Sequence, residues 1–202
     1  MTVEPCLTWQ KCPDGYEITS LRNNDQEYFI VPKSHRLESF YPLKSHSALL
    51  KQLSGISTKR GFNQFANFNG LLSHPARPEP IQAWFQAATE MREASFKAEN
   101  YDFDQLTGYF KSNNKNFLNI ELEYENQTPK FVTKIGSLKD GMWWQFTQSL
   151  TNKHSFERCS LCFTWFTVGQ GTGRRRRTLN TKHSFCSPKH QGRYKYLQRD
   201  NE

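Results

Sequence analysis

Three cysteines and one histidine near the C-terminal end are the residues of this chain whose types and spacing best suit chemistry. The sequence reads Cys159-Ser-Leu-Cys162 and then, after twenty-three intervening residues, Cys186-Ser-Pro-Lys-His190. Zinc prefers four tetrahedral ligands drawn from Cys sulfur and His nitrogen, and two cysteines separated by two residues can form a tight knuckle around one edge of the metal. The spacing therefore predicts one zinc ion per chain, bound by Cys159, Cys162, Cys186 and His190.

The segments around the two ligand pairs predict how they are held in place. Ser187 is a favourable helix N-cap and Pro188 suits the first helical position, so Cys186 and His190 are expected to straddle the first turn of a helix. Between the pairs, the sequence favours a hairpin whose first strand, turn and second strand cover residues 163–168, 169–173 and 174–185. Knuckle, hairpin and ligand-bearing helix together predict a treble-clef-like finger.

Other histidines and cysteines fit a metal site less well. His183 is the main rival to His190, but it lies three residues before Cys186 in a segment expected to be a strand, and His154 is a more distant rival. The odd total of five cysteines argues against a disulfide framework. Two N-terminal cysteines, with five residues between them and no potential ligand nearby, are expected to be isolated thiols: Cys6 and Cys12.

The net positive charge of the chain lies in its C-terminal quarter. Residues 153–202 hold eleven Lys or Arg and three Asp or Glu, a surplus equal to the +8 of the whole chain, whereas residues 1–152 hold sixteen of each sign. A basic cluster binds polyanions because each neutralised phosphate releases counterions. We therefore expect the finger to bind nucleic acid, either DNA or RNA, through eight basic residues: Arg174, Arg175, Arg176, Arg177, Lys182, Lys189, Arg193 and Lys195.

The expected metal site does not predict an enzyme. A zinc ion bound by three thiolates and one imidazole has no open coordination position, so its role is expected to be structural. Residues 1–152 contain no HExxH helix, GxSxG elbow or phosphate-binding glycine loop. Polar candidates there are scattered and share no motif: His35, His46, His74, Glu79 and Glu90. Two alternatives stay open: a finger that docks an acidic protein partner, and an enzyme with an unrecognised site in the N-terminal domain.

Residues 156–199 resemble the C-terminal zinc finger of a broad group of bacterial proteins, and their outline is similar to the CGNR-type finger. The likeness rests on a knuckle followed by aromatic residues (Cys-Ser-Leu-Cys-Phe-Thr-Trp-Phe), a Gly/Arg stretch and the helix start Phe-Cys-Ser-Pro-Lys-His. It implies zinc at Cys159, Cys162 and Cys186, with His190 where many members carry cysteine. It also implies a role in transcription regulation or in a mobile element.

Ahead of this module, residues 1–152 are expected to form a mostly helical α+β domain with two β-hairpins. The hairpins are predicted at residues 15–32 and 117–135, and the helices at 45–53, 79–97, 103–111 and 138–150. An aromatic cluster within residues 62–72 is expected to be buried. The chain is thus divided into a domain at 1–152 and a zinc finger at 153–202.

Targeting signals are missing from the sequence. There is no apolar run of about 18 residues that would span a membrane. The first residues lack the basic and apolar regions of a secretory signal. We therefore expect a cytoplasmic protein that does not contact a membrane.

Overall fold

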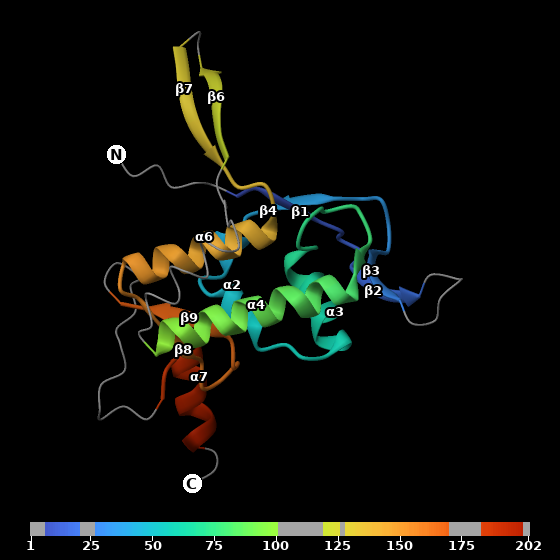
Figure 1. Cartoon of the computed structure of the whole chain (residues 1–202). Helices are drawn as coiled ribbons and strands as arrows, with labels where there is room; N and C mark the ends of the chain where they lie inside the picture. Colours follow the sequence, from blue (N-terminus) through green and yellow to red (C-terminus); the bar gives the residue numbers. More distant parts are fainter. Residues whose placement is uncertain (1–6, 21–26, 101–118, 126–127, 170–182, 200–202) are drawn as a thin grey trace.

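The computed structural model describes residues 7–20, 27–100, 119–125, 128–169 and 183–199, and it shows an α+β protein (Figure 1). Helices form the body of the molecule, and small antiparallel sheets lie around it. Some expected features fall outside the described residues and stay predictions: the helix at 103–111, the run Arg174 to Arg177, Lys182 and Cys6.

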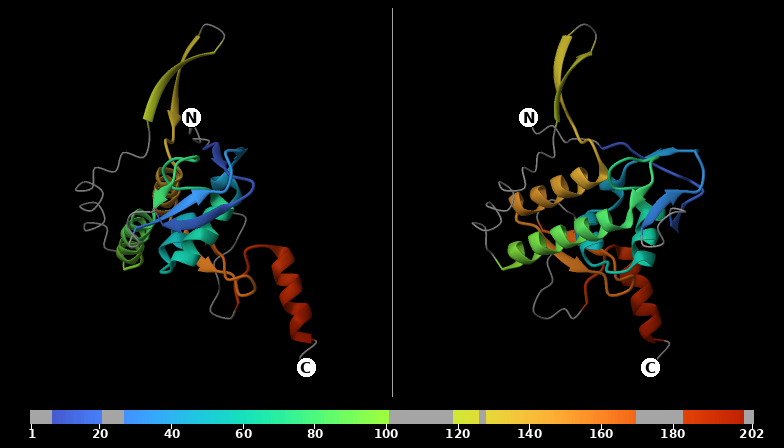
Figure 2. Two further views of the ribbon diagram at one scale, coloured as in Figure 1. Left: turned by 90° about the vertical axis from the view of Figure 1, so that its right-hand side faces the viewer. Right: turned by 45° about the vertical axis from the view of Figure 1, so that its right-hand side comes forward.

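Four helices make the body: α2 (Leu49–Ser54), α3 (Lys59–Asn69), α4 (Ile81–Glu99) and α6 (Leu138–Thr151). The two longer ones, α4 and α6, lie side by side, and α2 packs against both (Figures 1 and 2). Aromatic side chains such as Phe62, Trp84 and Trp143 fill the core and are almost fully buried, so ring burial is a large stabilising contribution. None of the helices in the described ranges has the length and apolar character that a membrane crossing needs.

Helix α2 is held at both ends by side chains from its neighbours. The N–H of Leu49 donates to Oε1 of Gln145 on α6 at 3.1 Å, and Nε of Arg92 on α4 donates to the carbonyl of Ser54 at 3.0 Å. These bonds satisfy terminal groups that so short a helix cannot pair internally. The position of α2 is therefore set by α4 and α6, and with it the position of Lys51.

The helices at 79–97 and 138–150 are confirmed to within two residues, as α4 and α6. The prediction of a helix at residues 45–53 is wrong at its start. Ser45 ends a separate turn, α1 (Pro42–Ser45), the backbone at His46 is extended, and the helix begins again only at Leu49. The aromatic cluster is also only partly buried, because Phe68 lies on the outer side of α3 with 71% of its surface exposed.

Both expected hairpins of the N-terminal region are present. β2 (Tyr16–Ser20) pairs with β3 (Tyr28–Pro32), and β6 (Asn119–Glu125) pairs with β7 (Thr128–Lys134) in a hairpin that extends away from the body (Figure 1). Three short strands were not expected from the sequence: β5 (Glu79–Pro80), which joins β3, and the pair β1 (Trp9–Lys11) and β4 (Glu38–Phe40).

A further hairpin begins the C-terminal region and packs on the helices. β8 (Ser155–Arg158) pairs with β9 (Trp165–Val168). The N–H of Thr167 donates to Oγ of Ser47 at 3.2 Å, and Nζ of Lys51 lies 5.2 Å from the ring centroid of Trp165. The expected first strand at 163–168 is present as β9, but its described partner is β8, a segment before the knuckle to which the sequence analysis assigned no strand. Most of the expected second strand, 174–185, lies outside the described residues, and residues 183–185 form no strand. The domain boundary at residue 152 stays a prediction.

Glu79 closes the loop between α3 and α4. Its carboxylate accepts hydrogen bonds from the N–H groups of Leu72 (2.9 Å), Ser73 (2.5 Å) and His74 (3.3 Å), and the residue is only 7% exposed. Burial raises the pKa of Glu79, although the three N–H donors act in the opposite direction. The sequence predicted no motif and only an ordinary surface position for Glu79, but the residue is buried, and it satisfies backbone donors that would otherwise be buried without partners.

Replacing Glu79 by alanine is expected to lower the free energy of unfolding by about 2 to 4 kcal/mol, because buried N–H groups lose their acceptor. Glu79→Gln keeps one acceptor oxygen and carries no buried charge, so its cost is expected to be less than half as large. Urea unfolding at neutral pH measures both. Glu93→Ala, on the exposed face of α4, is the matched control, and an equal loss in all three variants contradicts this account.

Candidate metal centre

The first ligand pair lies at the tip of the β8–β9 hairpin. The N–H of Cys159 donates to the carbonyl of Thr164 at 3.0 Å, and the N–H of Phe163 donates to the carbonyl of Cys159 at 2.9 Å. These bonds close the segment between the strands into a compact loop. Cys159 is fully buried at its base, whereas Cys162 is exposed.

The second pair is brought to the first by a short backbone connection. The N–H of Ser160 donates to the carbonyl of Ser184 at 2.8 Å, and the N–H of Ser184 donates to Oγ of Ser160 at 3.2 Å. Ser184 is two residues before Cys186, so this reciprocal pair holds Cys186 beside the knuckle. The sequence analysis did not identify either serine, since nothing in their spacing marks them.

The helix start expected after Cys186 is present. α7 (Pro188–Arg199) begins with proline, and Oγ of Ser187 accepts a hydrogen bond from the N–H of His190 at 3.3 Å. Sγ of Cys186, directly before the cap, lies 3.0 Å from Nδ1 of His190 in the first turn. The cap therefore directs the imidazole of His190 toward the three thiols.

The four expected ligands form one group. Their sulfur and nitrogen atoms all lie within 4.8 Å of one another. Sγ of Cys162 is 3.7 Å from Sγ of Cys186, which is too long for a disulfide, and Nδ1 of His190 is 3.6 Å from Sγ of Cys159 and 3.0 Å from Sγ of Cys186. The group can hold one metal ion.

The thiols influence one another's protonation. Burial raises the pKa of Cys159, but hydrogen bonds from three backbone N–H groups and from the ring of His190 outweigh it and lower that pKa to about 6. Burial, followed by the neighbouring thiols of Cys162 and Cys159, raises the pKa of Cys186 to about 12. A divalent cation among these groups favours all three thiolates, because it supplies the positive charge that they lack.

The rival ligands lie elsewhere. The ring of His183 packs on Tyr194 at a centroid distance of 4.7 Å, and their polar atoms Nε2 and Oη are 3.1 Å apart. His154 lies beside Gly169, at the far end of the hairpin from the knuckle. Cys12 is a buried free thiol in the main core.

Among the described residues, few apolar side chains support the metal centre. A small cluster of Cys159, Phe166 and Val168 is buried there, and Leu161, Phe185 and Cys186 pack against it. This cluster is separate from the large core of the helical body. So little buried apolar area contributes only modestly to stability, which makes a bound ion energetically important for this segment.

The basic residues that the structure describes lie on α7. Lys189, Arg193 and Lys195 are all exposed. The helix extends away from the rest of the molecule beyond its first turns (Figure 2), and its sequence contains no Asp or Glu. The other five expected basic residues fall in the segment from 170 to 182, which is outside the described ranges.

Comparison of this chain with protein-family models, with curated proteins and with solved structures finds no match. The features of the site itself therefore carry the functional argument.

Phe163 has an unusual backbone conformation directly after the second cysteine of the knuckle. Its φ is +59°, in the left-handed region that favours glycine. The side chain is exposed, and its ring lies 5.3 Å from the guanidinium carbon of Arg158. Such strain persists only where the surrounding structure imposes it. Here the N–H of Phe163 is held by the carbonyl of Cys159, in the closed loop that carries Cys162.

Comparing two small replacements isolates the effect of this conformation. Phe163→Gly and Phe163→Val both remove the ring, but only valine resists a positive φ, by about 1 to 2 kcal/mol. Metal affinity is expected to be roughly tenfold lower in the valine variant than in the glycine variant, since 1.4 kcal/mol is a factor of ten. Competition with a chromogenic chelator measures it. Equal affinities would show that metal binding does not require this knuckle geometry.

Proposed function

We propose that the metal is zinc and that it has a structural role. The observation that supports this most directly is that three thiols and one imidazole lie within 4.8 Å of one another. A tetrahedral zinc with Zn–S bonds of about 2.3 Å requires sulfurs about 3.8 Å apart, and the sulfurs of Cys162 and Cys186 are 3.7 Å apart. Three thiolates and one imidazole complete the preferred coordination, so water has no place at the metal and hydrolytic chemistry is not proposed.

The zinc would fix the direction of α7. An isolated helix of about twelve residues is marginal in water, and most of α7 is exposed. His190 and the Ser187 cap anchor its first turn, and Tyr194 in the next turn packs on His183 and Phe185 of the segment that leads into the helix. A metal bond from that turn to the knuckle is thus the main restraint on a helix that otherwise extends into solvent (Figure 2).

We propose that α7 binds nucleic acid, with duplex DNA favoured. Helical spacing places Lys189, Arg193 and Tyr196 along one side of the helix, away from His190 and Tyr194. Tyr196 is 65% exposed. Gly192 lies between these residues, and a Cβ added there would meet nothing within 4 Å, so packing within the chain does not require glycine. A missing side chain at that position allows the helix to approach a phosphate backbone closely.

The shape of the helix favours DNA over double-stranded RNA. The major groove of B-DNA is about 12 Å wide and accepts an α-helix, whereas that of A-form RNA is deep and narrow. A basic helix that projects from its domain can enter the major groove of B-DNA. The resemblance of residues 156–199 to a CGNR-type finger is consistent with this proposal and with a regulatory role.

One observation favours the alternative, an acidic protein partner. Leu197 is 42% exposed near the end of α7, next to Tyr196. Exposed apolar side chains beside basic ones also suit a protein interface. The two proposals differ in the ligand, so direct binding to a nucleic-acid duplex decides between them.

Replacing His190 by alanine is expected to weaken zinc binding by about tenfold or more, because a tetrahedral ligand is lost. Cys186→Ser should do the same. His183→Ala is the matched control: it removes a nearby imidazole that packs on Tyr194, so zinc should remain at one per chain. Metal analysis of the purified proteins measures the zinc content per chain, and chelator competition measures the zinc affinity. Zinc lost in His183→Ala and kept in His190→Ala would reverse the ligand assignment.

Exchanging Lys189, Arg193 and Lys195 together for glutamine is expected to reduce DNA affinity and to lower the slope of log K against log salt by roughly 2 to 3, because each phosphate contact contributes about 0.9. Fluorescence anisotropy with a labelled DNA duplex, repeated with the RNA duplex of the same sequence, measures this. The matched control exchanges three exposed basic residues outside α7, two in the loop between β3 and β4 and one on α3: Lys33, Arg36 and Arg60.

The control should leave both affinity and slope nearly unchanged. If both triple variants lose affinity equally, the binding is unspecific attraction to net charge. Binding that is absent at low salt, or insensitive to salt, contradicts the nucleic-acid proposal and favours the protein partner.

A further inference from the structure

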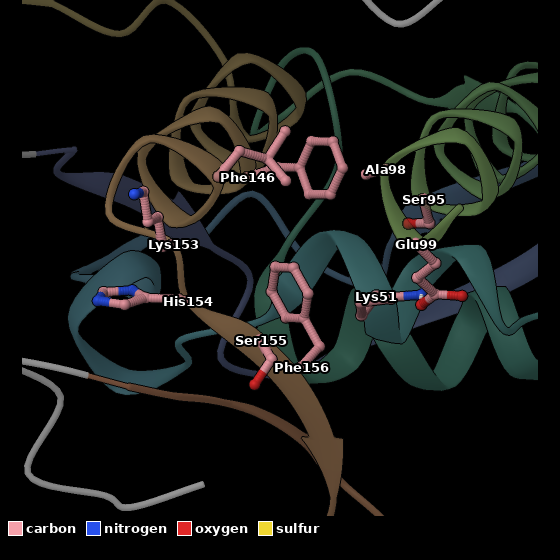
Figure 3. Close-up of a pocket in the computed structure, with 10 residues that line it drawn as sticks. Lys51, Ser95, Ala98, Glu99, Phe146, Lys153, His154, Ser155 and Phe156 are labelled. Carbon is pink, nitrogen blue, oxygen red and sulfur yellow. Dashed lines mark hydrogen bonds and ion pairs between the residues drawn. The ribbon is translucent and has the colours of Figure 1, made fainter. Parts of the chain in front are cut away.

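A cavity of about 590 Å³ lies between the helical body and the start of the C-terminal hairpin. It is walled by the C-terminal ends of α4 and α6, by α2 and by β8 (Figure 3). Its size is within the range of small-molecule sites, about 300 to 1,000 Å³. None of the four metal ligands lines it, so it is distinct from the candidate metal centre.

One part of the cavity wall is apolar. The rings of Phe146 and Phe156 are nearly parallel, with centroids 6.0 Å apart and an interplanar angle of 21°. Ala98 and Leu150 extend this surface. The two rings stand at the centre of the view in Figure 3, and they offer a continuous face to an apolar or aromatic body.

The charged groups around the cavity compensate one another or point elsewhere. Lys51 is ion-paired with Glu99, and its ammonium lies 5.2 Å from the ring centroid of Trp165. On the opposite side, the nitrogens of Lys153 and His154 are directed away from the two rings (Figure 3). The described residues that line the cavity therefore turn no uncompensated charge toward the rings. An ion that entered would lose its hydration without gaining a counter-ion, so the site favours a neutral molecule.

A polar group in the described lining lacks a hydrogen-bond partner. Ser95 on α4 is only 3% exposed, its Oγ has no partner among the described residues, and it is turned toward the rings (Figure 3). An unpartnered buried hydroxyl costs free energy unless a bound molecule satisfies it. A ketone or ester oxygen suits it, because it accepts the hydroxyl proton and brings no donor that the apolar wall would leave unsatisfied.

We propose that this cavity binds a small neutral ligand, an aromatic ketone or ester. Its ring lies against Phe146 and Phe156, and its carbonyl oxygen accepts a hydrogen bond from Oγ of Ser95. A carboxylic acid of the same shape binds more weakly, because nothing in the described lining compensates its charge. The inference goes beyond the proposed function and does not depend on zinc or on nucleic-acid binding.

Equilibrium dialysis of the full-length protein against 2-acetylnaphthalene tests this proposal, with 2-naphthoate as the charged ligand of nearly the same shape. We expect saturable binding of one ketone per chain, with a Kd between about 10 µM and 1 mM. Binding of the acid is expected to be at least about tenfold weaker, since it must bury an uncompensated charge. No saturable binding of the ketone up to about 1 mM, or binding of the acid as tight as that of the ketone, overturns the proposal.

Ser95→Ala tests the hydrogen bond. The change removes a buried hydroxyl that has no partner, so urea unfolding should show a stability at least equal to that of the parent chain. We expect the variant to bind 2-acetylnaphthalene about three- to tenfold less tightly, whereas its affinity for naphthalene, which has no carbonyl, should change by less than about twofold. Affinity for the ketone equal to that of the parent chain overturns the proposal.

Three further variants locate the binding. Ala98→Trp fills the cavity and is expected to weaken ketone binding by about tenfold or more, whereas Phe96→Trp, on the exposed side of the same helix, should change it by less than about twofold. An apolar probe can also adsorb to exposed rings. Phe68→Ala removes such a ring from α3 and should leave the affinity within about twofold of the parent value.

Binding unchanged in Ala98→Trp, or lost in Phe68→Ala, would place the probe outside the cavity and overturn the proposal. Because these measurements contain neither added metal nor nucleic acid, failure here leaves the zinc and DNA proposals to their own tests.

Discussion

The metal centre of the C-terminal region depends on the reciprocal pair of hydrogen bonds between Ser160 and Ser184, which holds the two ligand pairs together. The two ligand pairs are separated by twenty-three residues in the sequence, and only a few apolar side chains cluster around them. Closing a loop of that length costs conformational entropy, which so small a core does little to offset. The hydrogen bonds between residues 160 and 184 bring the segments together, and a metal ion bound by ligands from both sides stabilises the closed arrangement. Everything assigned to α7 depends on this closure, because the helix starts only four residues after Ser184.

The ligand set could be predicted because its signals are local. Two cysteines with two residues between them, and a serine and proline at a helix start, specify chemistry and geometry over a few residues. The structure brings the four ligands into one group, as these local signals predict. The hairpins at residues 15–32 and 117–135 and the helices α4 and α6 have equally local patterns.

The sequence contains no such local pattern for β8 or for the break between α1 and α2. Thr167 of the β8–β9 hairpin bonds Ser47, 120 residues away in sequence, and α2 starts where Gln145 accepts its first N–H, so both depend on tertiary partners. The cavity was equally beyond reach, since its lining comes from four separate elements.

Two residues with positive φ that are not glycine occur in the described parts of the chain, Lys153 and Phe163. One lies at the rim of the cavity and the other at the knuckle, so each is next to a proposed binding site. Left-handed backbone at a bulky residue costs stability unless neighbouring contacts impose it. In both places glycine would be the less strained choice. At Phe163 the ring against Arg158 is one local interaction that offsets part of this cost.

Strand β8 connects the two sites physically. Its second residue, Phe156, contributes a ring to the cavity, and the strand ends one residue before Cys159. Strand β9 is tied to the same region, because Trp165 receives the ammonium of Lys51, which also lines the cavity. Phe156 packs against the large core and Lys51 lies over the ring of Trp165, so both strands of the hairpin that carries the knuckle are tied to the helical body. The hairpin and the first turn of α7 share the metal ligands. The start of α7 is therefore positioned through this two-stranded hairpin, whose own core in the described residues is small.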